Sequence, residues 1–242
     1  MKKMNCSSRY GIGLFALVGV FLVGANIFAI SPGVQVSTFT EGFTKQSSPG
    51  LPEDWSVKVW RGTPEIELVK EHKGTVLKLR SHQSNVALYK EVEVDLAQYP
   101  NLSWEWKVTE FPEHGDARYA ERDDQAAGIF VVFPKFPAFL NSRIIGYVWE
   151  ADVPQGTIVK SHNDSRIHYV VVQSGKQEAG KWVQEVRNVE QDYEWIFGEK
   201  APKVGGVSLM IDSDHTQSSS ESFFGEIYFS AMPMLGMRQT GQ

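Results

Sequence analysis

Residues 182–229 read WVQEVRNVEQDYEWIFGEKAPKVGGVSLMIDSDHTQSSSESFFGEIYF, and this stretch decides the predicted fold. Val207, Leu209 and Ile211 alternate with other residues, which is the period-2 pattern of a half-buried β-strand. Charged residues stand on or beside the strand-like segments: Glu185, Arg187, Asp192, Asp212 and Asp214. A charge inside a β core is costly unless it is paired or binds something. The stretch therefore predicts strands that carry either a structural ion network or a binding site.

The same alternation recurs along the chain between turn signals. The predicted strands are Ser56–Trp60, Glu65–Val69, Thr75–Arg80, Asn85–Val94, Leu102–Val108, Gly128–Phe133, Ile144–Glu150, Ile167–Gln173, Trp182–Val189, Val207–Asp212 and Glu226–Phe229. About eleven short strands with almost no helical periodicity predict an all-β fold, a jelly-roll-like β-sandwich. The one helix-like segment is Glu190–Phe197, which ends at Gly198 as a C-cap would.

The N-terminus predicts export. Lys2, Lys3 and Arg9 precede an apolar run over residues 12–30, as in a signal peptide cleaved near residue 30. The run also reaches the roughly 20 residues that span a bilayer, so an uncleaved anchor is the alternative. We expect residues 1–30 to be a signal peptide or anchor helix, 31–38 a tether, 39–231 the sandwich and 232–242 a flexible tail. The protein is then periplasmic, or tethered through residues 12–30 to the outer face of the inner membrane.

The charge and the cysteine content argue against several classes of partner and of chemistry. The chain has 24 basic and 29 acidic residues, and three basic but no acidic residues lie in residues 1–30, so the remainder carries a charge of −8. This acidic balance argues against nucleic acid and anionic lipid as partners. Cys6 is the sole cysteine, so the exported part has no disulfide, no thiol nucleophile and no Cys-bound zinc.

The segment Asp212-Ser-Asp-His-Thr216 is a candidate cation site. Asp212 and Asp214 are separated by one residue, and two carboxylates beside a Thr oxygen suit calcium. No EF-hand spacing follows, so the alternative is a strand end whose carboxylates cap a turn or pair with Arg187. We therefore expect no cofactor other than, at most, calcium at these two residues.

Two further constellations have a functional and a structural interpretation. Asp123 and Asp124 precede a hydrophobic strand and form either an acid/base couple, a ligand grip or a solvated loop. Tyr147 and Trp149 share one strand face, where they either stack on a ligand or pack in the core. The six histidines have no metal-hydrolase spacing, and no nucleophile motif is present. These absences favour a binding protein over an enzyme.

Seven blocks taken in order resemble a known family: LPEDW, SWEWKV, DDQAAGIFVVF, YVWE, WVQEVRNVEQDYEWIFG, GGVSLMIDSDHT and FFGEIYF. They are similar to the bacterial domain of unknown function family 3047, roughly from Phe39 to Ser230. The resemblance implies an exported jelly-roll sandwich akin in shape to carbohydrate-binding modules, and no established activity. The motif positions that match are Asp123, Asp124, Trp182, Glu185, Arg187, Asp192, Tyr193, Asp212, Asp214 and Thr216. The chain departs at Gly128, where an Arg is expected, and at His215, where Asn is usual.

Three functions follow as hypotheses. The leading one is an exported, non-catalytic cell-envelope module that binds a glycan or other polyhydroxylated ligand. Its expected ligand-binding residues are Glu105, Asp123, Asp124, Tyr147, Trp149, Glu185, Arg187, Asp212 and Asp214. The alternatives are a polysaccharide-acting enzyme that pairs Asp123 or Asp124 with another carboxylate, and a structural envelope protein that binds another protein.

Overall fold

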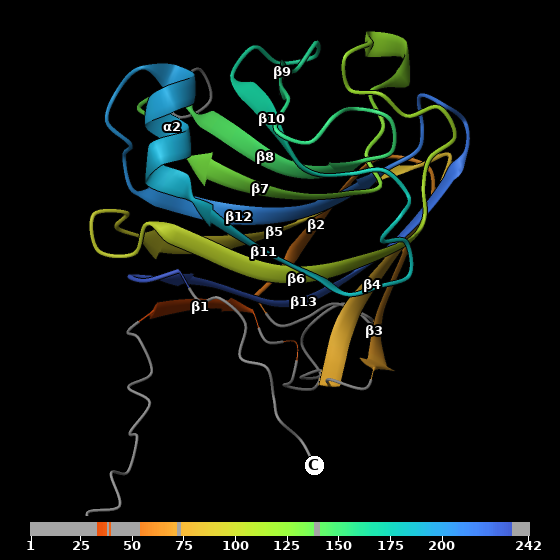
Figure 1. Cartoon of the computed structure of the whole chain (residues 1–242), viewed down its shortest axis with the longest axis horizontal. Helices are drawn as coiled ribbons and strands as arrows, with labels where there is room; N and C mark the ends of the chain where they lie inside the picture. The colour runs from red at the N-terminus through yellow and green to blue at the C-terminus, as the bar shows by residue number, and fades with distance from the viewer. Residues whose placement is uncertain (1–32, 38, 40–53, 72–73, 138–140, 234–242) are drawn as a thin grey trace, which may run out of the picture. The chain divides into compact units, whose positions relative to one another are not determined.

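The computed structural model describes residues 33–37, 39, 54–71, 74–137 and 141–233 (Figure 1). All of them belong to the unit Ser31–Gln242. The expected signal or anchor lies outside the described residues, as does most of the expected tail. Within the described ranges, no helix has both the length and the apolar character needed to cross a membrane.

One sheet, called sheet A, has the strand order β11-β6-β13-β4-β3, with β1 paired to β13 beside this path. Its strands are β11 (Val183–Asn188), β6 (Asn101–Glu110), β13 (Ser219–Ser230), β4 (Gly74–His82), β3 (Glu65–Glu71) and β1 (Gly33–Ser37). Every pairing in it is antiparallel. Strands β6, β13 and β1 run along the lower layer in Figure 1.

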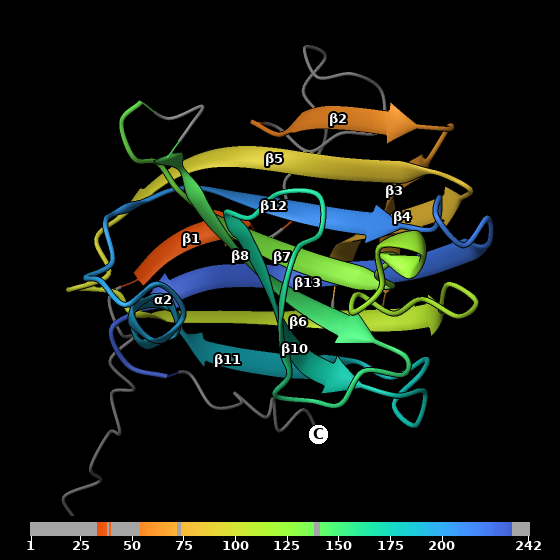
Figure 2. The same ribbon diagram turned by 90° about the horizontal axis from the view of Figure 1, so that it is seen from above.

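The second sheet, sheet B, has the order β2-β5-β12-β7-β8-β10-β9 and is seen from above in Figure 2. Its strands are β2 (Ser56–Arg61), β5 (Asn85–Val94), β12 (Val204–Asp212), β7 (Ala127–Phe133), β8 (Arg143–Glu150), β10 (Ile167–Ser174) and β9 (Ile158–Lys160). Strands β8 and β10 are parallel, which departs from the antiparallel pairing of a jelly roll.

The main core lies between the two sheets and follows from the period-2 pattern. On β6, Trp104 and Trp106 point inward, and on β8, Tyr147 and Trp149 point inward to meet them. Ring centroids lie 5.5 Å apart for Trp104 and Tyr147, and 5.8 Å apart for Trp106 and Trp149. Aromatic pairs add about 0.5–1.5 kcal/mol each beyond the burial of their area. These contacts therefore fix how the two sheets face each other.

A smaller core covers the outer face of sheet B. It contains Ala117, Phe130, Val148, Val153, Val159, Tyr169 and Val171. The Phe130 ring lies across Gly128 and Gly146, because a Cβ at either glycine would come within 2.6 Å of a ring carbon. Loops before β7 and after β8 thus pack on sheet B, and they bring their polar residues to this outer face.

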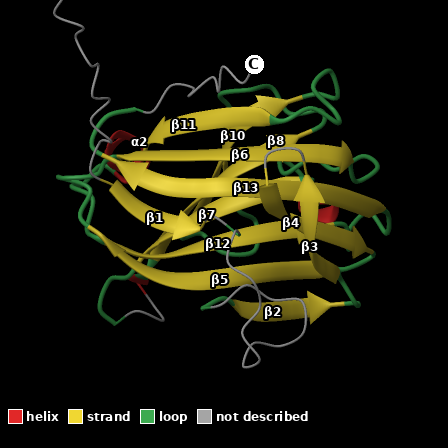
Figure 3. Cartoon of the chain, turned by 90° about the horizontal axis from the view of Figure 1, so that it is seen from below, coloured by secondary structure: helices red, strands yellow, loops and turns green. Residues whose placement is uncertain are grey.

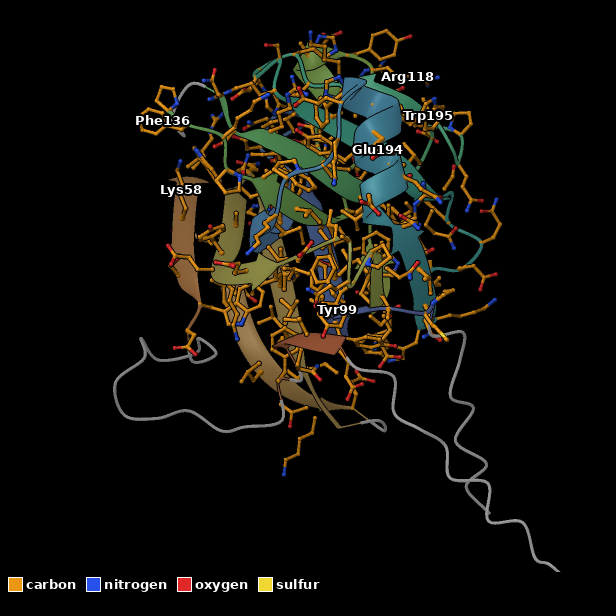
Figure 4. All side chains as sticks on the ribbon, turned by 90° about the vertical axis from the view of Figure 1, so that its left-hand side faces the viewer. Lys58, Tyr99, Arg118, Phe136, Glu194 and Trp195 are labelled. Atoms are coloured by element: carbon orange, nitrogen blue, oxygen red, sulfur yellow. The ribbon has the colours of Figure 1, made fainter. Side chains whose placement is uncertain are left out.

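Helix α2 (Val189–Phe197) joins β11 to the chain that enters β12. It begins where Asn188 Oδ1 accepts a hydrogen bond from Gln191 N, and it ends at Gly198 with a φ of +69°. Its Tyr193 packs inward on Phe133, with ring centroids 4.6 Å apart. Glu194 and Trp195 lie on its outward side (Figure 4).

The described residues confirm an all-β sandwich, with thirteen strands instead of about eleven. The expected tether is wrong over Gly33–Ser37, because this segment forms β1 against the end of β13 (Figure 3). The strand expected over Glu226–Phe229 begins earlier in the structure, because β13 starts at Ser219. Ser220 and Ser222 are buried there, since small hydroxyl side chains fit between the sheets.

Candidate functional site

An acidic cluster lies at one end of the outer face of sheet B. Asp212 ends β12, Glu150 ends β8, and Asp123 and Asp124 stand just before β7. These positions meet because β7 is antiparallel to both β12 and β8. We call the following six residues the acidic cluster: Asp116, Asp123, Asp124, Glu150, Asp212 and Asp214.

Asp124 fastens the loop between β12 and β13. Its carboxylate is fully buried and accepts hydrogen bonds from His215 N at 3.1 Å and from Thr216 N at 2.7 Å. The Thr216 hydroxyl donates to the same carboxylate at 2.6 Å. Hydrogen bonds from backbone N–H groups suit an ionised carboxylate. Asp124 therefore holds two segments together that are about 90 residues apart in sequence.

Asp212 is almost completely buried among other carboxylates. Asn85 Nδ2 donates to its Oδ2 at 2.7 Å, and Asp214 N donates to its Oδ1 at 3.2 Å. Burial raises the pKa of Asp212 to about 10, and the charges of Asp124 and Asp214 add to the rise.

Asp214 and His215 form the outer side of the cluster. His215 Nδ1 lies 3.1 Å from Asp214 Oδ1 and 3.4 Å from Asp124 Oδ1. Arg61 Nη1 lies 3.9 Å from Asp214 Oδ2, and the Arg61 side chain is mostly exposed. One ligand atom from each of Asp124, Asp212, Asp214 and His215 lies within 4.8 Å of the others. Three carboxylates and an imidazole at this spacing form a donor set of the kind that binds a metal ion.

Asp123 and Glu150 extend the group of buried carboxyls away from these donors. Asp123 Oδ1 accepts from Gln125 Nε2 at 2.7 Å, and burial raises the pKa of Asp123. Burial also raises the pKa of Glu150 well above its usual value, and the charges of Asp116 and Asp123 raise it further. Glu150 is 1% exposed, and its Oε1 has no hydrogen-bond partner among the described residues.

Arg187 does not reach the acidic cluster. Its guanidinium pairs with Asp192 on α2, and the Tyr147 hydroxyl donates to Asp192 Oδ2 at 2.8 Å. The alternative in which Asp212 or Asp214 pairs with Arg187 is therefore wrong. The reason is register: Arg187 lies opposite Leu102 on sheet A and faces inward, while Asp212 lies on the outer face of sheet B.

The remaining expected site residues are placed apart from the cluster. Tyr147 and Trp149 are fully buried, so the core-packing interpretation describes them and their faces are closed to a sugar. Glu185 faces inward beside Arg187, and burial raises its pKa to about 7. Glu105 alternates with Trp104 and Trp106 on β6, so it lies on the outer face of sheet A, on the other side of the sandwich.

The structure adds residues that the sequence analysis did not select. Asn85 and His215 contact the carboxylates directly, and Asp116 and Glu150 extend the cluster. Glu150 carried a usable signal, because alternation places it on the sheet face opposite Trp149. No sequence pattern marked Asn85 or Asp116. Asn85 reaches the carboxylates only through the pairing of its strand, and Asp116 only through a loop that folds back.

A pocket of about 490 Å³ opens next to the loop that Asp124 fastens. It lies among the end of β4, the loop after β6, the loop before β11 and the loop before β13. The lining residues are His82, Thr109, Glu110, Phe111, Glu113, Lys176, Ala179, Gln217, Ser218 and Ser219. Ser218 Oγ accepts from Glu113 N at 3.0 Å and contacts the Thr216 hydroxyl at 2.6 Å. The pocket and the acidic cluster therefore share one loop.

Residues 53–228 match the model of a family described as "Protein of unknown function (DUF3047)". The chain belongs to this family. The match covers the strands from β2 nearly to the end of β13, so DUF3047 includes both sheets, the acidic cluster and the pocket. No curated protein sequence matches the chain.

Three solved structures that resemble this DUF3047 protein are matched over nearly their whole length. The family 30 carbohydrate-binding module of a Clostridium thermocellum cellulosomal cellulase is 11% identical, with 83% of this chain and 98% of that one covered and a TM-score of 0.46. The xyloglucanase domain of NopAA from Sinorhizobium fredii is 10% identical, with 74% and 93% covered and a TM-score of 0.43. The K1 cleaved adhesin domain of Lys-gingipain from Porphyromonas gingivalis is 12% identical, with 83% and 99% covered and a TM-score of 0.37.

Other matches are partial. The chain covers 57% of a structure titled for the promiscuous specificity of β-sandwich carbohydrate-binding modules, and 22% of the Endo-D structure from Streptococcus pneumoniae. Both are 10–11% identical to it, with TM-scores of 0.39.

Proposed function

We propose that this protein is an exported, non-catalytic module of the cell envelope that binds a glycan or another polyhydroxylated ligand in the pocket beside the β12–β13 loop. The pocket is the observation that carries the proposal. Its volume of about 490 Å³ falls within the range of about 300–1,000 Å³ that small-molecule sites occupy.

The lining chemistry suits a sugar. Each sugar hydroxyl both donates and accepts, so a sugar site needs both kinds of group at close spacing. Glu110 and Glu113 accept, Lys176 donates, and the hydroxyls of Thr109, Ser218 and Ser219 do either. Phe111 supplies an apolar surface for the carbon-bound hydrogens of a ring.

Burial of the carboxylates supports a binding role over catalysis. A glycosidase needs two carboxyl groups about 5–10 Å apart across the bond to be cleaved. Asp123, Asp124 and Asp212 are each at most 3% exposed, and Asp124 is engaged by the backbone of the β12–β13 loop. The catalytic alternative built on Asp123 or Asp124 therefore lacks an approach for a polysaccharide.

One observation favours a second candidate function, that of a polysaccharide-acting enzyme. Glu110 and Glu113 both line the open pocket, although Arg80 Nη2 lies 3.8 Å from Glu110 Oε2. Release of reducing ends from any polysaccharide that the protein binds, with loss of release in Glu113→Gln, would favour the enzyme. Binding without release supports the module.

A glycan array with protein expressed from the full sequence tests the binding proposal. We expect a bound sugar whose signal falls at least tenfold in Lys176→Ala and in Glu113→Gln. Lys58→Ala is the matched control, because Lys58 is an exposed lysine on β2 away from the pocket. A folded protein that binds no envelope or extracellular sugar would refute the proposal, as would equal loss in the control.

Export is proposed from residues 1–30 alone. Fractionation of cells that express the full sequence, followed by N-terminal sequencing, tests it. We expect the protein outside the cytoplasm, either starting near residue 30 or intact and in the membrane fraction. Recovery of intact protein from the cytosol would refute export.

A further inference from the structure

The acidic cluster concentrates buried negative charge that the chain itself compensates poorly. Arg61 approaches Asp214 at 3.9 Å, but its side chain is 59% exposed. Arg118 is engaged by Asp116, with its Nη2 2.7 Å from Asp116 Oδ2. No Lys or Arg among the described residues forms an ion pair with Asp124, Asp212 or Glu150. Burying carboxylates without counter-charge is costly.

Unsatisfied buried oxygens are an independent sign of a missing partner. Asp214, one of the four residues whose ligand atoms come together, has a buried Oδ1 without a hydrogen-bond partner among the described residues. The unpartnered Oε1 of Glu150 lies beside Asp116 and Asp123 instead. Asn85 Oδ1 is also buried without a partner, while its Nδ2 donates to Asp212. Oxygens of this kind are the atoms that a bound cation satisfies.

The geometry of the donors specifies where a cation would sit. Oxygens of Asp124, Asp212 and Asp214 and a nitrogen of His215 lie within 4.8 Å of one another, which leaves each pair able to touch one ion. An ion with ligands at 2.3–2.6 Å, as calcium has, fits between oxygens at about this separation. Carboxylate oxygens are the ligands that calcium prefers, and its flexible coordination tolerates an irregular set.

We propose that the DUF3047 sandwich binds one divalent cation, calcium, between Asp124, Asp212 and Asp214. The ion neutralises the end of β12 and ties the β12–β13 loop to the segment before β7. This loop supplies Gln217, Ser218 and Ser219 to the pocket wall, so the cation also orders one side of the proposed sugar site. The cation site itself is independent of the proposed sugar binding.

A competing arrangement would neutralise the cluster with protons alone. The two arrangements predict different responses to added metal, because only the cation site takes up calcium.

The experiment uses protein expressed from the full sequence, stripped with EDTA and dialysed into metal-free buffer at pH 7.5. Titration with CaCl2 is followed by calorimetry and by the melting temperature, with MgCl2, MnCl2 and ZnCl2 as parallel arms. We expect one calcium per chain and a rise in melting temperature.

Asp212→Asn is the decisive variant. It keeps the size of the side chain, so the metal-free variant should stay folded and melt near the wild-type temperature. Its calcium affinity should fall at least about 100-fold, since a ligand rather than a supporting residue is lost. Glu226→Gln is the control, because it removes an exposed acid on β13 and should leave affinity unchanged.

The outcomes are separable. Absence of binding heat and of any melting shift with up to 10 mM of any of the four metals would overturn the cation site. Tighter binding of Zn²⁺ than of Ca²⁺ would overturn the assignment to calcium. Wild-type affinity in Asp212→Asn would overturn the location. Calcium binding in a protein that binds no sugar would support this proposal and count only against the pocket.

Discussion

Arg187 and Asp192 form a two-point ion pair inside the sandwich. Arg187 Nε lies 3.0 Å from Asp192 Oδ2, and Arg187 Nη2 lies 2.5 Å from Asp192 Oδ1. The Tyr147 hydroxyl donates to the same carboxylate from β8. One aspartate on α2 thus joins β11 of sheet A to β8 of sheet B, which makes the charges of this segment part of the framework.

Arg187→Ala should lower the free energy of unfolding by about 2–4 kcal/mol, because it leaves the buried Asp192 without its cation. Asp192→Asn should cost a similar amount, and the double variant should cost less than the sum of the two. Urea unfolding of the three variants measures this coupling. Additive losses would contradict the pair, and loss of sugar binding in a stably folded Arg187→Ala would give the residue a ligand role that its position does not predict.

Glu185 should make stability depend on pH between pH 5 and 8. Burial raises its folded-state pKa to about 7 from the ordinary 4.5, against the effects of Trp106 and Arg187. The folded state therefore prefers the protonated carboxyl, so this contribution is complete below about pH 4.5 and is lost as the pH rises through about 7. Over that window it amounts to roughly 1–3 kcal/mol.

The readout is the difference between wild type and Glu185→Gln in urea unfolding at several pH values. The Gln variant should gain stability relative to wild type as the pH rises from 5 to 8. Glu226→Gln, which changes an exposed acid on β13, serves as the comparison. A Glu185→Gln curve parallel to that of the wild type would mean that Glu185 is solvated.

Gly146→Ala should destabilise the outer layer of sheet B. The new Cβ would lie 2.6 Å from Phe130 Cε1, and the same ring also contacts Tyr169 edge-on. We expect a loss of about 1–3 kcal/mol from overpacking. Phe130→Leu in the Gly146→Ala background should recover part of it, as thermal unfolding can measure. A tolerated alanine at Gly146 would show that the ring has room to move.

Trp149→Phe should cost about 2–4 kcal/mol, since it removes a buried ring portion together with the indole N–H that donates to Gly175 O at 3.1 Å. The rings of Trp106 and Phe111, which pack on Trp149, would lose contact area. Denaturant unfolding checks this value. An unchanged stability would revive the interpretation of Trp149 as a surface platform.

Local patterns predicted the strands well because alternation depends only on which residues face a core. Residues 102–108 and 207–212 lie in strands as expected, and Gly198 ends α2 as expected. Patterns failed for β1 and for the start of β13. Val34 and Val36 on β1 are too short a run to be distinctive, and Ser220 and Ser222 are buried by the sheets around them.

The residues of the candidate site were also predicted only in part. The sequence marked Asp123, Asp124, Asp212 and Asp214 as unusual, and they do gather with His215. The sequence marked Glu105, Tyr147 and Arg187 equally, but in the folded protein these residues lie away from the acidic cluster. Whether two charged side chains meet depends on strand order and on the face to which each points, and neither is encoded by spacing along the chain.

By itself, the sequence determined the fold class, because period-2 alternation bounded by turn residues needs no knowledge of distant contacts. It also determined that the charges near Trp182–Phe229 need partners. Only the tertiary structure decided which partners: Asp192 for Arg187, and Asn85 with the backbone N–H of Asp214 for Asp212. The physical reason is that burial and neighbouring charge set the energy of an ionisable group, and both arise only when the two sheets and their loops close on one another.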